Sequence, residues 1–133
     1  GAPTYLIVNT LEGVLAQRLV RTLCKECKQP DPNPQKELMA TLEEFEIDTS
    51  KATIMKPQGC KKCMNTGMKG RVAIHELLVM NDEIRKVCLK EISAEAIREV
   101  AVKHWMRTML KDGLIKVTMG LTTYEELLTS CQR

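Results

Sequence analysis

The sequence carries two Cys-x-x-Cys pairs, Cys24 with Cys27 and Cys60 with Cys63. A tight turn over two intervening residues brings both thiols of a pair to the same side of the chain. Two such pairs can therefore supply the four thiolates of a closed tetrahedral Zn²⁺ site. A closed site keeps no position open for water, which indicates a structural metal. We expect these cysteines to hold the fold together, and the function must be inferred from the residues around them.

Thirty-two residues separate the two pairs, more than is usual in zinc ribbons and knuckles. The insertion between the pairs must then be a small folded segment. Closing this longer loop costs only slightly more entropy than closing a short one. Free buried cysteines are one alternative to a metal site. A redox Cys-x-x-Cys is another, although such motifs normally stand alone near a βαβ unit. Cations beside the pairs would offset the net −2 of a zinc tetrathiolate; they are Lys25, Lys28, Lys61 and Lys62.

Composition narrows the class of protein. At 133 residues and 44% hydrophobic, the chain can bury one ordinary core. Six cysteines without a signal peptide favour a reducing compartment. A formal charge of +3 with only 3% aromatic residues argues against a nucleic-acid partner, and no apolar run is long enough to span a bilayer. The start at Gly1-Ala2-Pro3, without an initiator Met, suggests a piece of a longer protein.

The N-terminal half shows mixed periodicity. Leu6 to Ala16 has the apolar spacing of a helix, and Gln17 to Leu23 alternates as a strand would, although continuation of the helix is also open. Asn33 as N-cap and Pro34 at the first helical position predict a helix to about Glu46, with Leu38, Leu42 and Phe45 on its apolar side. A short strand is possible over Ala52 to Lys56.

The C-terminal half is predicted to be mainly helical after a strand over Arg71 to Val79, in which Val72 and Ile74 share a face. Asn81-Asp82 begins a helix with Ile84, Val87, Cys88 and Ile92. Ser93 caps another, whose buried side runs from Ile97, Val100 and Ala101 to Trp105, Met109 and Leu110. Gly113 and Gly120 are expected to interrupt the C-terminal segment. Thr122 to Glu125 forms a capping box before a last helix with Leu127 and Leu128.

Other polar residues have ordinary interpretations. We expect Cys88 in the core, Cys131 as a frayed free thiol, His75 and Glu76 in structural hydrogen bonds, and His104 on a helix surface. Arg18 and Arg21 are either solvated or positioned to reach a phosphate or a neighbouring subunit. No G-x-x-x-x-G-K-[ST] loop and no Ser/His/Asp or Cys/His nucleophile arrangement is present, so the chain is not a convincing enzyme by itself.

Three segments together resemble the C-terminal region of the type II secretion and type IV pilus assembly ATPases. They are the run from Leu11 to Cys24, the run from Gly59 through Gly70-Arg71 to Ile74-His75-Glu76-Leu77-Leu78, and the run from Asp112-Gly113-Leu114 to Gly120-Leu121-Thr122-Thr123-Tyr124-Glu125-Glu126. Met68 departs from the resemblance, because the family commonly has an aromatic residue there, and should affect packing more than metal binding.

The resemblance implies a cytoplasmic hexameric motor, attached peripherally to the inner membrane through the platform proteins of a secretion or pilus machine. The family's nucleotide-binding motifs would precede Gly1, so ATP and Mg²⁺ would belong to the parent protein only. The implied fold is α+β. Residues 1–23 would be the tail of a RecA-like core, 24–70 a tetracysteine zinc-binding subdomain and 71–133 a mostly helical subdomain. A free-standing zinc-binding adaptor that recognises nucleic acid or protein is the alternative.

Overall fold

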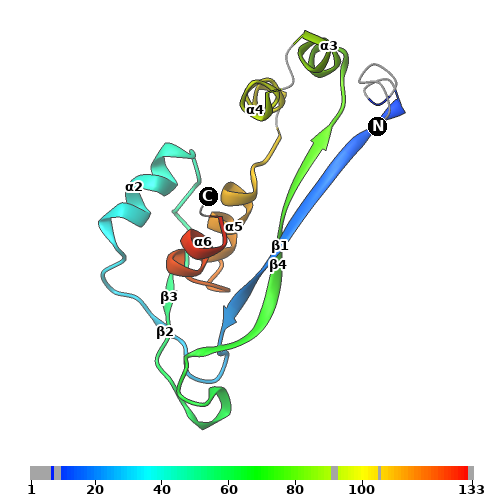
Figure 1. Cartoon of the computed structure of the whole chain (residues 1–133). Coiled ribbons are helices and arrows are strands. Elements are labelled where there is room, and N and C mark those ends of the chain that lie inside the picture. Colours follow the sequence, from blue (N-terminus) through cyan, green and yellow to red (C-terminus); the bar gives the residue numbers. More distant parts are fainter. Residues whose placement is uncertain (1–6, 8–9, 91–92, 105, 132–133) are drawn as a thin grey trace. The chain divides into compact units, whose positions relative to one another are not determined.

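The computed structural model describes residues 7, 10–90, 93–104 and 106–131 (Figure 1). Within these residues the fold is mixed α/β, with five α-helices and two small two-stranded sheets. Contacts divide the chain into two compact units, Gly1–Ala16 with His75–Thr108 and Gln17–Ile74 with Met109–Arg133. The helices are α2 (Lys36–Glu44), α3 (Asp82–Lys90), α4 (Ala94–Lys103), α5 (Met109–Thr118) and α6 (Tyr124–Cys131), and the strands are β1 (Gly13–Leu23), β2 (Gln29–Pro30), β3 (Met55–Lys56) and β4 (Met68–Val79).

Strands β1 and β4 form one sheet, and their arrows run in opposite directions in Figure 1. The strand expected over residues 17–23 is confirmed. The helix expected over Leu6 to Ala16 is wrong for residues 13–16, which already belong to β1, while Leu6 lies outside the described residues. Backbone pairing with a distant strand has overridden a local helical pattern there.

Strands β2 and β3 form a second, antiparallel sheet in which Gln29 pairs with Lys56 and Pro30 with Met55. The strand expected over 52–56 is thus limited to its last two residues. Helix α2 lies between β2 and β3 in the sequence. The N-cap expected at Asn33 is wrong, because Gln35 is the N-cap and the helix begins at Lys36. The amide of Asn33 instead donates to the Asp31 carboxylate at 3.0 Å, which closes a turn before the helix.

The core of the unit formed by 17–74 and 109–133 joins β1, α2, β4, α5 and α6. Its buried members are Val20, Leu38, Leu42, Ile74, Leu114, Val117, Tyr124 and Leu127. The predicted apolar stripe of α2 is confirmed, because Leu38 and Leu42 are buried and Phe45 packs beside them.

Helices α5 and α6 pack closely because α5 carries a glycine at the contact. A Cβ on Gly113 would lie 2.4 Å from Leu127 Cδ2, so the close packing requires glycine there. Gly113 was expected to interrupt the C-terminal segment, but it lies inside α5. The start of α6 also differs from the predicted capping box. Thr123 Oγ1 accepts from the Glu126 amide, whereas the Thr122 hydroxyl donates to the Arg21 carbonyl at 2.8 Å.

In the unit formed by 1–16 and 75–108, both predicted helix starts are confirmed. Asn81 Oδ1 accepts from the Ile84 amide at 2.9 Å, and Ser93 Oγ accepts from the Ala96 amide at 3.3 Å. The continuous helix expected from Ser93 to Leu110 is wrong, because α4 ends at Lys103 and Met109 begins α5. The Met106 amide bonds to the Ala101 carbonyl at 3.0 Å, which closes the end of α4. Ile92 and Trp105 lie outside the described residues.

Among the described residues, no helix combines the length and the hydropathy needed to cross a bilayer.

The two adjacent leucines of α6 provide a matched test of this packing. Leu127 is fully buried and Leu128 is 38% exposed. We expect Leu127→Ala to lower the free energy of unfolding in urea by about 2–5 kcal/mol, because it leaves a cavity against α5. Leu128→Ala makes the same change in helix propensity and should cost no more than about 1 kcal/mol. Equal losses would contradict the packing described here.

Candidate metal centre

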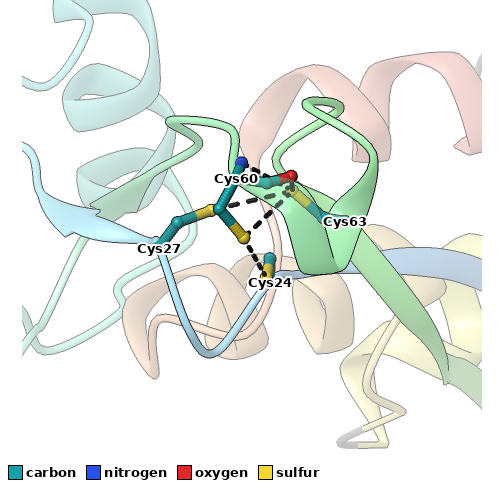
Figure 2. Close-up of side chains that lie close together, drawn as sticks. All are labelled: Cys24, Cys27, Cys60 and Cys63. Atoms are coloured by element: carbon teal, nitrogen blue, oxygen red, sulfur yellow. Dashed lines mark hydrogen bonds between the residues drawn. The ribbon is translucent and has the colours of Figure 1, made fainter.

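The four cysteines of the two pairs come together at one point (Figure 2). Cys24 and Cys27 lie in the turn that follows β1. Cys60 directly precedes a short 3₁₀ helix, η1 (Lys61–Cys63), and Cys63 is the last residue of that helix. All four sulfurs lie within 4.8 Å of one another. Three of the separations are known individually: 3.8 Å for Cys24–Cys60, 3.8 Å for Cys27–Cys63 and 3.7 Å for Cys60–Cys63.

These separations fit a tetrahedral metal site. A tetrahedron with metal–sulfur bonds of about 2.3 Å has edges of roughly 3.8 Å. The observed spacings match that edge length and far exceed the roughly 2.05 Å of a disulfide. Among the residues that the structure describes, these cysteines are the one group of three or more His, Cys, Asp or Glu side chains arranged to hold a metal ion.

The turn around Cys60 and Cys63 is tight and uses left-handed backbone. Met64 and Asn65 have φ of 57° and 61°, and the Asn65 amide bonds to the Cys60 carbonyl at 2.8 Å. Gly67 has a φ of 75°, and a Cβ there would lie 2.5 Å from Pro57 Cβ. The position therefore requires glycine for both conformation and space. Its amide points back to the cluster, donating to Cys63 Sγ at 3.2 Å.

Backbone amides surround the sulfurs as donors. The amides of Gly59 and Cys60 donate to Cys27 Sγ and Cys63 Sγ at 3.3 and 3.2 Å. Burial raises the pKa of the Cys27 thiol to about 11, and its three neighbouring thiols add to that rise. Burial acts in the same direction at Cys63, but the amides of Cys60 and Gly67 and the adjacent thiols lower the pKa of Cys63 to about 6. Thiolates this close repel one another, so full ionisation requires a cation among them.

The insertion between the pairs is folded, as its length requires. The chain leaves the first cysteine pair through β2 and returns to the second pair through β3, which is paired with β2. Helix α2 lies between these strands in the sequence, and its Leu38 and Leu42 join the core. The Thr53 amide also bonds to the Thr118 carbonyl at the end of α5, at 2.7 Å. These contacts fix the ends of the excursion close to the cysteines.

The four lysines beside the pairs have different environments. Lys28 Nζ donates to the Gly120 carbonyl at 2.9 Å, just after α5, and Lys62 forms an ion pair with Glu26 at 3.6 Å. Lys25 and Lys61 are exposed, and the described residues offer them no ion pair. Of these four lysines, Lys28 is the one whose side chain bonds to the segment between α5 and α6, a role that the sequence did not indicate.

Arg18 and Arg21 contact α6 within their own unit. Arg18 Nη1 donates to the Ser130 carbonyl. Arg21 Nε donates to Glu126 Oε1 at 2.9 Å, and the Arg21 amide donates to Glu126 Oε2. The side-chain hydrogen bond lowers the pKa of Glu126 and raises that of Arg21, although burial opposes both shifts. Sequence reasoning missed this pairing because no local pattern links residues 105 positions apart.

The remaining candidates are not members of the cysteine cluster. Cys131 belongs to α6 and packs against the core, so the expectation of a frayed end is wrong. Cys88 is half-buried in α3. His104 is partly exposed, as expected, and its Nε2 lies 2.5 Å from Glu83 Oε2. His75 and Glu76 lie in β4, and each has a partner.

The Arg21–Glu126 pair predicts a pH-dependent contribution to stability. Because the pKa of Glu126 is lower in the folded than in the unfolded chain, the pair stabilises the fold above the unfolded value of about 4.3 and is lost as pH falls through the folded value. We expect Glu126→Gln to lower the free energy of unfolding by about 1 kcal/mol at neutral pH. The difference from the wild type should vanish in acid.

Glu125→Gln, one residue earlier, is the matched control, because Glu125 is exposed and has only a weak contact with Gln35. Its effect should be small at every pH. A Glu126→Gln effect that persists unchanged in acid would argue against the ion pair.

Comparison with known proteins places this centre in a family. A sequence model described as "Type II/IV secretion system protein" matches residues 1–129. The chain is 46% identical over 131 residues to the type IV pilus assembly ATPase PilB of Thermus thermophilus. It is 38% identical over 129 residues to the type II secretion system protein E of Pectobacterium carotovorum, and 37% identical over 130 residues to the type II secretion system ATPase E of Vibrio cholerae.

Each of these alignments covers 96% of the chain but a small part of the relative: 14% of the Thermus protein, 24% of the Pectobacterium protein and 25% of the Vibrio protein. The similarity runs through the cysteine cluster and the segments on both sides of it. The chain therefore belongs to the type II/IV secretion system protein family, which includes type II secretion proteins E and type IV pilus assembly ATPases.

Proposed function

We propose that this chain is the noncatalytic zinc-binding module of a hexameric ATPase that powers protein export or pilin assembly. Family membership supports the assignment to a secretion or pilus motor. The absence of a G-x-x-x-x-G-K-[ST] loop from the sequence supports a noncatalytic role, with ATP and Mg²⁺ bound elsewhere in the parent protein. The parent would act in the cytoplasm, on platform proteins of the inner membrane.

The observation that carries the metal assignment is the gathering of four sulfurs within 4.8 Å of one another, with three separations of 3.7 to 3.8 Å that match the edge of a zinc tetrathiolate. Cys24, Cys27, Cys60 and Cys63 would each supply one thiolate. An all-sulfur tetrahedral donor set suits Zn²⁺ and leaves no coordination position for a substrate. The metal would accordingly supply folding free energy and no chemistry.

The centre's connections suggest how it serves a motor. The Leu23 amide, next to Cys24, bonds to the Leu121 carbonyl at 2.9 Å, and Lys28 Nζ bonds to the Gly120 carbonyl. The metal would therefore stiffen a segment already joined to the turn between α5 and α6. A stiff module of this kind can transmit rotations of the nucleotide-bearing core to a neighbouring subunit or a platform protein. A flexible loop in its place would transmit them poorly.

We further propose the domain organisation implied by the family. Residues 1–23 would form the tail of the RecA-like core, 24–70 the metal subdomain and 71–133 the helical subdomain. The nucleic-acid or protein adaptor is the weaker candidate, because the relatives named above are secretion and pilus proteins.

Metal content tests the centre directly. Purified chain should contain one equivalent of zinc by elemental analysis, and Cys60→Ser should lose most of it because one of four thiolates is gone. Cys88→Ser is the control, since Cys88 lies outside the cluster, and should keep the full equivalent. Equal zinc content in the two variants would contradict the assignment.

The coupling role requires the full-length motor. Cys60→Ser there should sharply reduce secretion or pilus assembly in cells, while purified enzyme retains a substantial part of its ATP hydrolysis, because the nucleotide site lies elsewhere. Cys88→Ser should leave both activities near wild type. Normal secretion by a Cys60→Ser motor that has lost its zinc would limit the metal to local stabilisation.

A further inference from the structure

A small cavity is lined by residues from β3, α5 and the starts of α2 and α6. Its volume is about 100 Å³, and all of its lining residues belong to the unit that carries the cysteine cluster. Three of them, Leu38, Val117 and Tyr124, are buried members of the core of that unit. Two more, Ile54 and Met55, are half-buried. The cavity therefore has a largely apolar interior.

Three charged side chains also line this cavity, and all of them reach solvent: Asp31 is half-buried, and Lys56 and Glu125 are exposed. Asp31 Oδ1 accepts from the Asn33 amide at 3.0 Å. Glu125 Oε1 accepts from Gln35 Nε2 at 3.3 Å. One oxygen of each carboxylate is thus engaged within the chain.

The second oxygen of each carboxylate is open to a ligand. Within the part of the chain that the structure describes, Asp31 Oδ2 and Glu125 Oε2 have no hydrogen-bond partner, and no cation pairs with either acid. Lys56 lies at the same border without forming an ion pair to them. Two acids and one base give the lining a net charge of −1.

Size and charge together select the kind of ligand. Pockets for small organic ligands usually enclose roughly 300–1,000 Å³, so a cavity of about 100 Å³ suits a single side chain better. The carboxylates repel an anion and attract a cation. An apolar interior below a charged border matches a side chain that has a methylene stem and a charged head, as Arg and Lys do.

Arginine fits this cavity better than lysine. Its planar guanidinium carries five N–H donors and can donate to two carboxylates from different edges, whereas an ammonium is a point charge. Arginine is also enriched at protein–protein interfaces, and lysine is depleted there.

We propose that this cavity binds an arginine side chain of a partner protein. The methylenes of the arginine lie against Leu38, Ile54 and Tyr124, and its guanidinium donates to Asp31 Oδ2 and Glu125 Oε2. One side chain gives weak affinity by itself, so the contact orients a partner that other surfaces also hold. The site uses none of the four cysteines and no nucleotide, so its test is independent of the tests of the proposed function.

The test is an NMR titration of the isotope-labelled, zinc-loaded chain with the peptide acetyl-Gly-Arg-Gly-amide. The backbone amide signals of Asp31, Ile54 and Glu125 should shift saturably, with a dissociation constant on the order of 1 mM. The same peptide with citrulline in place of arginine carries a neutral urea of nearly the same shape. It should bind about tenfold more weakly, because the charge-assisted hydrogen bonds are lost. Methylguanidinium, which has the charged head without the stem, should also bind about tenfold more weakly.

Charge-removing variants locate the binding site. Asp31→Asn keeps an Oδ1 acceptor for the Asn33 amide, and Glu125→Gln keeps the length of the side chain. Each variant should weaken binding of the arginine peptide about fivefold, and the double variant should weaken it by more than about tenfold.

Two further variants separate this site from general attraction of a cation to the chain. Lys56→Gln removes a like charge from the border and should strengthen binding about twofold. The charge-matched control is Glu43→Gln with Glu44→Gln, two exposed acids at the end of α2 that do not line the cavity, and it should bind as the wild type does. Unchanged amide signals outside the cavity show that each variant is folded.

Equal binding of the arginine and citrulline peptides, or equal losses in the cavity and control double variants, would overturn the proposal. Methylguanidinium that binds as tightly as the peptide would overturn the burial of the stem. Self-association of the chain that the cavity double variant abolishes would overturn the choice of partner, because a second copy of the chain would then supply the arginine.

Discussion

The convergence of four sulfurs from two turns that lie 32 residues apart is the constraint on which the rest of this structure depends. It brings the end of β1 to the start of β4 and closes the excursion through β2, α2 and β3. The amides that donate to the sulfurs come from the same turns, so backbone conformation and ligand geometry fix each other. A metal ion at this point would relieve the repulsion between thiolates and convert binding free energy into folding free energy.

Contacts of α5 and α6 connect the cysteine turns to the rest of their unit. Gly113 allows Leu127 to approach α5 closely, while Arg21 and Thr122 join β1 to α6 and to the turn before it. Both ends of α5 are thus held, by side-chain packing at one end and by Lys28 at the other. Under the proposed function, such a body would serve the motor as a lever.

Features decided by neighbouring residues could be predicted from the sequence. The two Cys-x-x-Cys turns, the apolar stripe of α2 and the helix starts at Asn81 and Ser93 are of this kind. The family resemblance is confirmed as well. It rested on ordered segments flanking the cysteines, which ordinary zinc ribbons lack.

Features decided by distant partners could not be predicted. Residues 13–16 form a strand because β4 pairs with β1, and Gly113 lies inside a helix because Leu127 fills the space beside it. The break between α4 and α5 and the Arg21–Glu126 pair likewise depend on tertiary contacts. X-ray absorption at the zinc edge tests the central claim most directly. The account predicts four sulfur neighbours at about 2.3 Å, and nitrogen or oxygen ligands, or no bound zinc, would contradict it.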